Sequence, residues 1–146
     1  MKMVKWMRNV MNKHKKPEHL MIGSFGENKA KCFLKTLGYR FLIANYQTER
    51  GEIDLVFRSK SEALLLFVEV KTRSFIDMTL KPSNLVSLRQ RKRINSAALD
   101  YLKELGNPKV RIQFDIIVVE YSGRSQFSIH HIPRAFGLMG GRDYRT

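Results

Sequence analysis

The sequence predicts an α/β domain in which helices flank a mixed five-stranded sheet. Apolar residues recur at helical spacing in two segments, and they alternate or form short runs in five others. The second helical segment separates the third predicted strand from the fourth, and a connection of that length allows the two strands to pair in parallel. A length of 146 residues suits one domain with a core of its own.

The first predicted helix ends at Gly38, because glycine commonly follows the last turn of a helix. Its beginning has two alternatives. Ser24 and Glu27 have the spacing of a capping box, which would start the helix at that point. The helix would otherwise begin near Glu18, with two glycines inside it. The apolar positions that define it are Ala30, Phe33, Leu34 and Leu37.

Three strands follow this helix, and a loop, a second helix and two more strands complete the order. We expect the strands at 39–46, 51–58 and 63–72, the loop at 73–83, the second helix at 84–105, and the last strands at 109–121 and 126–132. The third strand begins with a run that is apolar on both faces, which predicts a central place in the sheet.

We divide the chain into a basic N-terminal arm at 1–17, a domain at 18–133 and a C-terminal tail at 134–146. The first sixteen residues carry six Lys and Arg and no acid. They form either a disordered arm that binds nucleic acid or a weakly amphipathic helix that seeks a membrane surface, and we favour the arm. The tail is rich in Gly and Arg.

The charge balance predicts a polyanionic partner. Lys and Arg number 27 against 13 Asp and Glu, a net charge of +14, which suits nucleic acid or an anionic membrane surface. The alternative is a well-charged surface that serves solubility alone. No apolar run approaches the ~18 residues of a membrane span. The single cysteine, Cys32, excludes an intrachain disulfide, and we expect a cytoplasmic protein.

Two acids and a lysine lie on the second and third predicted strands. Side chains alternate along a strand, so Asp54 shares a face with Val56, while Glu69 and Lys71 share a face with Phe67. A hairpin about the turn at 59–64 can place Asp54 opposite Glu69. The same register places Val56 opposite Phe67 and the acid at position 52 opposite Lys71.

Two opposed carboxylates repel each other, and a divalent cation between them removes the repulsion. Oxygen ligands with water in the remaining positions suit Mg²⁺ or Mn²⁺. Lys71 would then handle a water molecule or stabilise charge on a phosphate. The alternative is an ion-pair ladder of Glu52, Glu69 and Lys71. Glu27 either joins the metal site or serves the capping box named above.

Several segments resemble the YraN-like family, which belongs to the restriction-endonuclease-like PD-(D/E)xK superfamily and is similar to archaeal Holliday-junction resolvases. The resemblance covers roughly residues 20–120. The segments that carry it are Gly26-Glu27-Asn28-Lys29-Ala30, Gly38-Tyr39, Gly51-Glu52-Ile53-Asp54-Leu55-Val56, Phe67-Val68-Glu69-Val70-Lys71-Thr72-Arg73, Arg89-Gln90, Ala97, Tyr101-Leu102 and Phe114-Asp115-Ile116-Ile117. One departure is Ala44, which stands where we expect a basic residue before Asn45.

The resemblance implies a restriction-endonuclease-like core and an Mg²⁺- or Mn²⁺-dependent endonuclease that cuts structured or single-stranded nucleic acid. It also suggests a homodimer. It implies these roles: Asp54, Glu69 and Glu27 as metal-binding acids, Lys71 as the catalytic lysine, Gln90 near the site, and Arg73, Arg91, Lys92 and Arg93 as phosphate contacts. The basic run at 89–93 alternatively forms a solvated helix face. Two other functions remain: a nucleic-acid-binding protein with a dormant nuclease site, and a structural basic protein.

Overall fold

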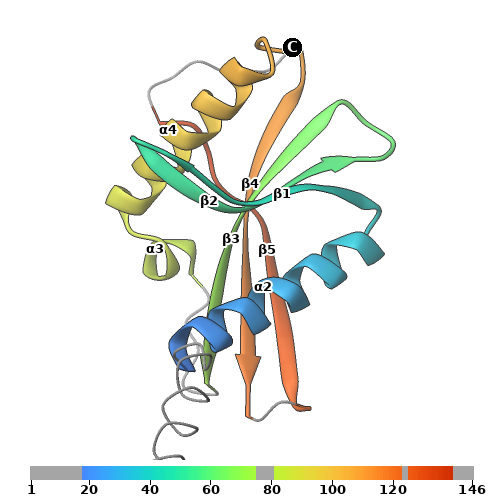
Figure 1. The fold of residues 1–146 in the computed structure, drawn as a ribbon, viewed down its shortest axis with the longest axis vertical. Helices are drawn as coiled ribbons and strands as arrows, with labels where there is room; N and C mark the ends of the chain where they lie inside the picture. Colours follow the sequence, from blue (N-terminus) through green and yellow to red (C-terminus); the bar gives the residue numbers. More distant parts are fainter. Residues whose placement is uncertain (1–17, 75–80, 123–124, 140–146) are drawn as a thin grey trace, which may run out of the picture.

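A five-stranded sheet organises the chain, and the computed structural model confirms the predicted α/β class (Figure 1). The structure describes residues 18–74, 81–122 and 125–139, with side chains from residue 21 onward. The elements are α2 (Glu18–Thr36), β1 (Tyr39–Thr48), β2 (Gly51–Ser59), β3 (Leu64–Ser74), α3 (Pro82–Leu85), α4 (Leu88–Glu104), β4 (Arg111–Tyr121) and β5 (Phe127–Phe136).

The strands lie side by side in chain order, β1-β2-β3-β4-β5. Three neighbouring pairs are antiparallel, and β3 pairs with β4 in parallel through the connection that contains α4, so the sheet is mixed as predicted. The strand β3 is central and pairs with β4 along its whole length, from Leu64 to Ser74. Figure 1 shows the strong twist of the sheet and how β2 and β3 run apart beyond their shared segment.

Each long helix covers one face of the sheet, and the alternation along the strands explains why. Leu55 and Phe57 of β2 pack in one apolar cluster with Ala30 and Leu34 of α2. Val56 of β2 packs in a second cluster on the α4 side. This alternation gives each helix its own core. The second cluster also contains Phe67, Phe114, Ile116, Ile94, Ala97, Ala98 and Leu102.

The helix α2 begins at Glu18, so the earlier of the two predicted starts is correct and Ser24 is not an N-cap. Gly26 therefore lies inside the helix. A Cβ added at Gly26 would stand 1.7 Å from Oγ1 of Thr72 on β3. Glycine at this position thus allows α2 to approach the sheet closely, next to Glu27, whose charge acts on Asp54 of β2.

The helix α4 begins at Leu88, so the start predicted at residue 84 is wrong. Ser87 caps it through a reciprocal capping box with Gln90: the Ser87 side chain accepts from the Gln90 amide, and the Gln90 side chain accepts from the Ser87 amide. The short α3 precedes this cap, with proline at its first turn. The S-x-x-Q spacing at 87–90 was the sequence signal for this boundary.

The strand β5 continues to Phe136, beyond the end predicted at residue 132. The strand accommodates Pro133 because β5 lies at the edge of the sheet and its register with β4 shifts between Phe114 and Ile116. Asp115, fully buried, stabilises this irregularity by accepting from the Arg134 amide at 3.0 Å and lying 2.6 Å from Nε2 of His131. Asp115 therefore has a structural role.

The predicted arm at 1–17 and most of the predicted tail lie outside the described residues. The same holds for 75–80, within the predicted loop. In the part of the chain that is described, no helix is long and apolar enough to span a membrane.

We expect Gly26→Ala to lower the free energy of unfolding by about 1–3 kcal/mol, because the added methyl group overpacks the contact with Thr72. Gly23 provides a matched control in the same helix, since a Cβ there meets no atom within 4 Å. Gly23→Ala should stabilise by about 0.5–1 kcal/mol through helix propensity. Urea denaturation of both variants measures the difference, and equal effects would contradict the close approach of α2 and β3.

Candidate functional site

The predicted acids meet where β2 and β3 separate. The two strands pair from Arg58 and Leu65 to Leu55 and Val68, and Val56 lies opposite Phe67 as the sequence predicted. Asp54 and Glu69 are the next residues in this register, just beyond the last paired positions. Because the ladder stops here, the predicted opposition of Glu52 and Lys71 does not form.

The Asp54 carboxylate takes the place of the missing strand pairing. Its Oδ2 accepts a hydrogen bond from the Val70 amide at 2.8 Å, so the side chain of one strand satisfies the backbone of the other. This bond fixes the carboxylate between the diverging strands. It also holds Asp54 beside Glu69, whose charge acts on Asp54.

Lys71 is the third residue of the candidate site, after Asp54 and Glu69. Its Nζ lies 2.9 Å from Oε1 of Glu69, with the lysine side chain 27% exposed and the glutamate side chain 13% exposed. An ammonium group in such a half-buried ion pair is held in one position and remains accessible to a ligand from solvent. The structure therefore brings Asp54, Glu69 and Lys71 together.

The pKa of Asp54 is raised by burial and by the neighbouring acids. Burial raises the pKa of this carboxyl group, the charge of Glu69 raises it further, and the more distant Glu27 adds to the effect. The hydrogen bond from the Val70 amide opposes the rise, and the resulting pKa is about 7. A carboxyl group with this pKa is held half-protonated near neutral pH, and a nearby cation would return it to the charged form.

The helix α4 packs tightly against the beginning of β2 and closes the site on one side. A Cβ added at Gly51 would stand 1.9 Å from the backbone oxygen of Arg93, so glycine is required for this approach. A small cavity of about 40 Å³ remains between the helix and the strands. It is lined by Glu52, Glu69, Gln90, Arg93 and Ile94.

Glu27 reaches the site from α2, on the opposite side of the sheet. Its Oε2 accepts a weak hydrogen bond from the Asn45 side chain at 3.4 Å. Asn45 has a left-handed backbone with φ of 52°, which asparagine tolerates better than most residues. Since α2 begins well before Ser24, Glu27 is free of the capping role, and its charge acts on Asp54.

The arrangement of oxygen donors suits a hard divalent cation held by two carboxylates. Within the described residues no group of three His, Cys, Asp or Glu side chains lies close enough together to hold an ion. Mg²⁺ is usually bound through one or two carboxylates together with water and substrate phosphates. Asp54 and Glu69 fit that mode, whereas Glu27 would act through an intervening water.

Arg73, predicted to contact phosphate, is held partly by the protein. Its Nη2 lies 3.4 Å from Oε1 of Glu120, whose side chain is 1% exposed, and His130 lies 3.6 Å from the other oxygen of the same carboxylate. A buried carboxylate needs such partners. The Arg73 side chain, 31% exposed, therefore has a structural role in addition to any contact with a ligand.

The basic run on α4 divides into structural and accessible members. Arg91 donates to the Val86 carbonyl at 3.2 Å and stacks over the Phe136 ring, so it holds the beginning of the helix. Gln90 serves the capping box and also lines the small cavity. Lys92 and Arg93 are exposed, and Arg93 lies at the cavity.

Two residues near the site were not predicted to belong to it. Asn45 contacts Glu27, and Gly51 sets the distance between α4 and β2. Gly51 stands in a segment that carries the family resemblance, and Asn45 follows the departure at Ala44, but alternation along a strand assigns no role to an amide or a glycine. Close approach of two backbones is a tertiary property, so residue chemistry alone did not reveal it.

A comparison with known proteins covers the residues of the candidate site. The model described as "Uncharacterised protein family UPF0102" matches residues 26–119, a range that contains Glu27, Asp54, Glu69, Lys71 and all of α4. The chain belongs to the UPF0102 family. This confirms the predicted YraN-like relationship at the level of the family.

The relatives that match have the same family name. A UPF0102 protein of Pelobacter propionicus is 37% identical over 124 residues, which cover 84% of this chain and 87% of the relative. A UPF0102 protein of Desulfosudis oleivorans is 40% identical over 114 residues, covering 78% and 88%. A third, from Chlorobium phaeobacteroides, is 34% identical over 121 residues, covering 80% and 93%. The similarity thus spans most of each relative.

We expect Asp54→Asn to stabilise the protein at pH 8 and to lose this advantage toward pH 4. The raised pKa means that native Asp54 keeps a proton which the unfolded chain loses near pH 4, so wild-type stability falls as pH rises from about 4 to about 7. Asparagine accepts from Val70 without charge. The gain is at most about 4 kcal/mol, since one pKa unit corresponds to about 1.4 kcal/mol.

Urea unfolding of the wild-type protein and Asp54→Asn at pH 4, 6 and 8, without divalent metal, measures this pH dependence. Asp100→Asn serves as a control, because the Arg50 side chain lowers the pKa of that carboxyl group. Loss of the Asp100 charge should therefore destabilise the protein at pH 8 rather than stabilise it. A stability difference for Asp54→Asn that stays constant over the pH range would contradict the crowding of acids.

Proposed function

We propose that the protein is an Mg²⁺- or Mn²⁺-dependent endonuclease with a restriction-endonuclease-like core, acting on structured or single-stranded nucleic acid. The observation that carries the proposal is the meeting of Asp54, Glu69 and Lys71 at the point where β2 and β3 separate. Two acids and a lysine on a basic protein supply what metal-assisted phosphodiester hydrolysis requires. The net charge of +14 favours a polyanionic substrate.

Each side chain would have a distinct part. Asp54, fixed by the Val70 amide, and Glu69 would hold the metal ion, which when bound polarises a phosphate and acidifies water. Lys71 would lie beside the phosphate and stabilise its developing negative charge, since Glu69 holds the ammonium group in place. Arg93, exposed at the mouth of the small cavity, would contact a neighbouring phosphate.

A specific observation favours a second candidate, a nucleic-acid-binding protein with a dormant site. The Glu69 carboxylate is already paired with Lys71, and the described residues offer no third ligand in place. In that case the basic surface binds and the acids do not cut. Cleavage assays and metal-binding measurements distinguish the nuclease from the dormant binding protein. A protein that neither cuts nor binds nucleic acid would be a structural basic protein.

We expect purified protein with Mn²⁺ to nick branched, flapped or single-stranded substrates, and Asp54→Asn, Glu69→Gln and Lys71→Gln to lower the rate at least ~100-fold. Two variants provide matched controls for the loss of one charge. Glu62→Gln removes an exposed acid paired with Arg111, and Lys103→Gln removes an exposed lysine near the end of α4. Cleavage that is unchanged in Asp54→Asn and Lys71→Gln would contradict the proposed nuclease.

We expect Mn²⁺ or Mg²⁺ to raise the melting temperature, because an ion that binds the native state alone stabilises it. At a concentration one hundred times the dissociation constant the gain is about 2.7 kcal/mol, or roughly 5–10 °C for a domain of this size. The shift should vanish in Glu69→Gln and remain in Glu62→Gln. A wild-type protein that shows no shift with either ion would favour the structural alternative.

A further inference from the structure

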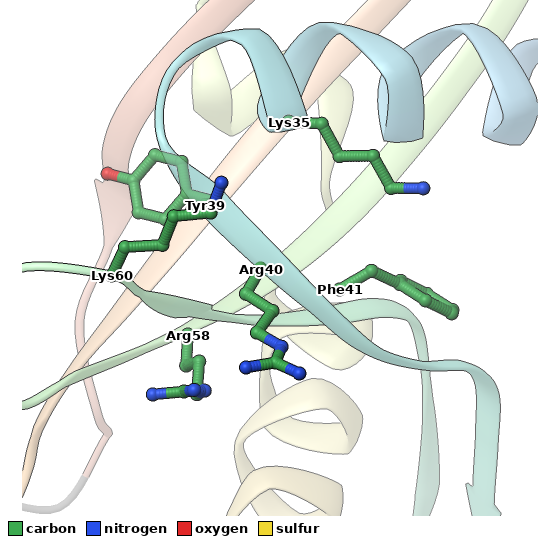
Figure 2. A pocket seen from close by; sticks show the side chains of 6 residues that line it. All are labelled: Lys35, Tyr39, Arg40, Phe41, Arg58 and Lys60. Carbon is green, nitrogen blue, oxygen red and sulfur yellow. The ribbon is translucent and has the colours of Figure 1, made fainter.

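A basic groove lies at the far end of the β2–β3 hairpin from the candidate metal site. It has a volume of about 540 Å³ and is formed where α2 ends and β1 begins. Figure 2 shows the six side chains that line it: Lys35, Tyr39, Arg40, Phe41, Arg58 and Lys60. Four of these are positively charged and none is acidic, so the groove attracts anions.

Two arginines face each other directly across β1 and β2. Arg40 is the cross-strand partner of Arg58, and their side chains leave the two strands in the same direction (Figure 2). Directly opposed side chains have Cβ atoms about 5 Å apart, and like charges in this position destabilise a sheet. A bound anion between the two guanidinium groups would convert this repulsion into attraction.

The protein itself provides little neutralisation. Within the described residues, no carboxylate forms an ion pair with any cation of the groove. Glu62, which follows Lys60 in the same turn, is paired with Arg111. The positive charge of the groove is therefore available to a ligand.

An aromatic ring holds further positive charge on the opposite face of the same two strands, toward α2. The ammonium groups of Lys31 and Lys35 lie 4.2 Å and 6.0 Å from the centre of the Phe41 ring. The ring packs edge-on against Phe57 of β2, which fixes it on the sheet. Cation–π contacts of this kind place the two lysines of α2 in advance, so less entropy is lost when an anion binds.

The groove and the candidate metal site lie along one strand. Arg58 follows Asp54 by four residues on β2, a distance of about 13 Å along the strand. A nucleic-acid strand that passes the acids can thus reach the groove with neighbouring phosphates. Arginine pairs are well suited to phosphate, because the planar guanidinium group donates two parallel hydrogen bonds.

We propose that this groove binds the phosphate backbone of a nucleic-acid strand, and that it holds the same strand whose cleavage would occur at Asp54 and Glu69. The second clause rests on the proposed function, whereas the binding itself does not. The contacts are to phosphate alone, so the groove fixes the position of the strand without selecting a base sequence.

The test is the binding of a fluorescent single-stranded oligonucleotide to Arg40→Gln/Arg58→Gln, measured by anisotropy in EDTA at several salt concentrations. We expect affinity to fall at least ~10-fold and the log–log salt slope to flatten by about 1.4, that is about 0.7 for each of two lost phosphate contacts. The double variant should melt at or above the wild-type temperature, since opposed like charges are removed. Weaker binding would then not reflect unfolding.

Two controls separate the groove from net charge. Lys103→Gln/Lys109→Gln also removes two exposed cations but leaves the groove intact, and it should bind within about twofold of wild type. Arg40→Lys/Arg58→Lys keeps the charge and should retain most of the salt slope. Equal losses in the two glutamine pairs would overturn the proposal, as would Arg40→Gln/Arg58→Gln that binds oligonucleotide normally and instead loses binding to phosphatidylserine vesicles.

The outcome for the groove is independent of the outcome for the nuclease. If wild type fails to cut but Arg40→Gln/Arg58→Gln loses oligonucleotide binding, the groove stands and the proposed nuclease fails. If wild type cuts and the double variant binds and cuts normally, the nuclease stands and the groove fails. Binding by Asp54→Asn at wild-type strength would show that the groove acts without the metal site.

Discussion

The hydrogen bond from the Val70 amide to the Asp54 carboxylate is the contact on which the site depends. The two central strands separate at this point, and a side chain rather than a backbone group satisfies the freed amide. A carboxylate used in this way is fixed in position and buried beside a second acid. The same bond that is formed where the β2–β3 ladder ends thus also holds two carboxylates side by side.

Like charges crowd together at two places on β2, with opposite signs. Asp54 lies beside other acids near the middle of the strand, while Arg58 faces Arg40 near its end. Like charges placed this closely are uncommon unless a ligand compensates for them. A phosphate backbone with its associated cation, as proposed above, would supply both compensations at once, since the cation would meet the acids and the phosphates would meet the arginines.

The sequence predicted the sheet because period-two alternation is a local feature, and the register assumed about the turn at 59–64 is correct for Val56 and Phe67 but not for Glu52 and Lys71. The predicted start of α4 is wrong because the S-x-x-Q at Ser87 marks the true start. The S-x-x-E at Ser24, by contrast, lies inside a helix that has already begun. The same assumed register placed Asp54 opposite Glu69, and these two are the next residues beyond the last paired positions. It gave no sign that Arg73 would pair with the buried Glu120, because that contact depends on a tertiary arrangement of β3 and β4.

Some basic residues are engaged by other protein groups and others are accessible, and this difference bears on the path of a ligand. Arg73 and Arg91 looked equivalent to Lys92 and Arg93 in the sequence, yet the first two are engaged by Glu120 and by Val86 and Phe136. The open cations of the groove lie instead along β1 and β2. In the proposed complex, a nucleic-acid strand at the acids would run along β2 toward the groove, and α4 would contribute mainly by closing the site through its contact with Gly51.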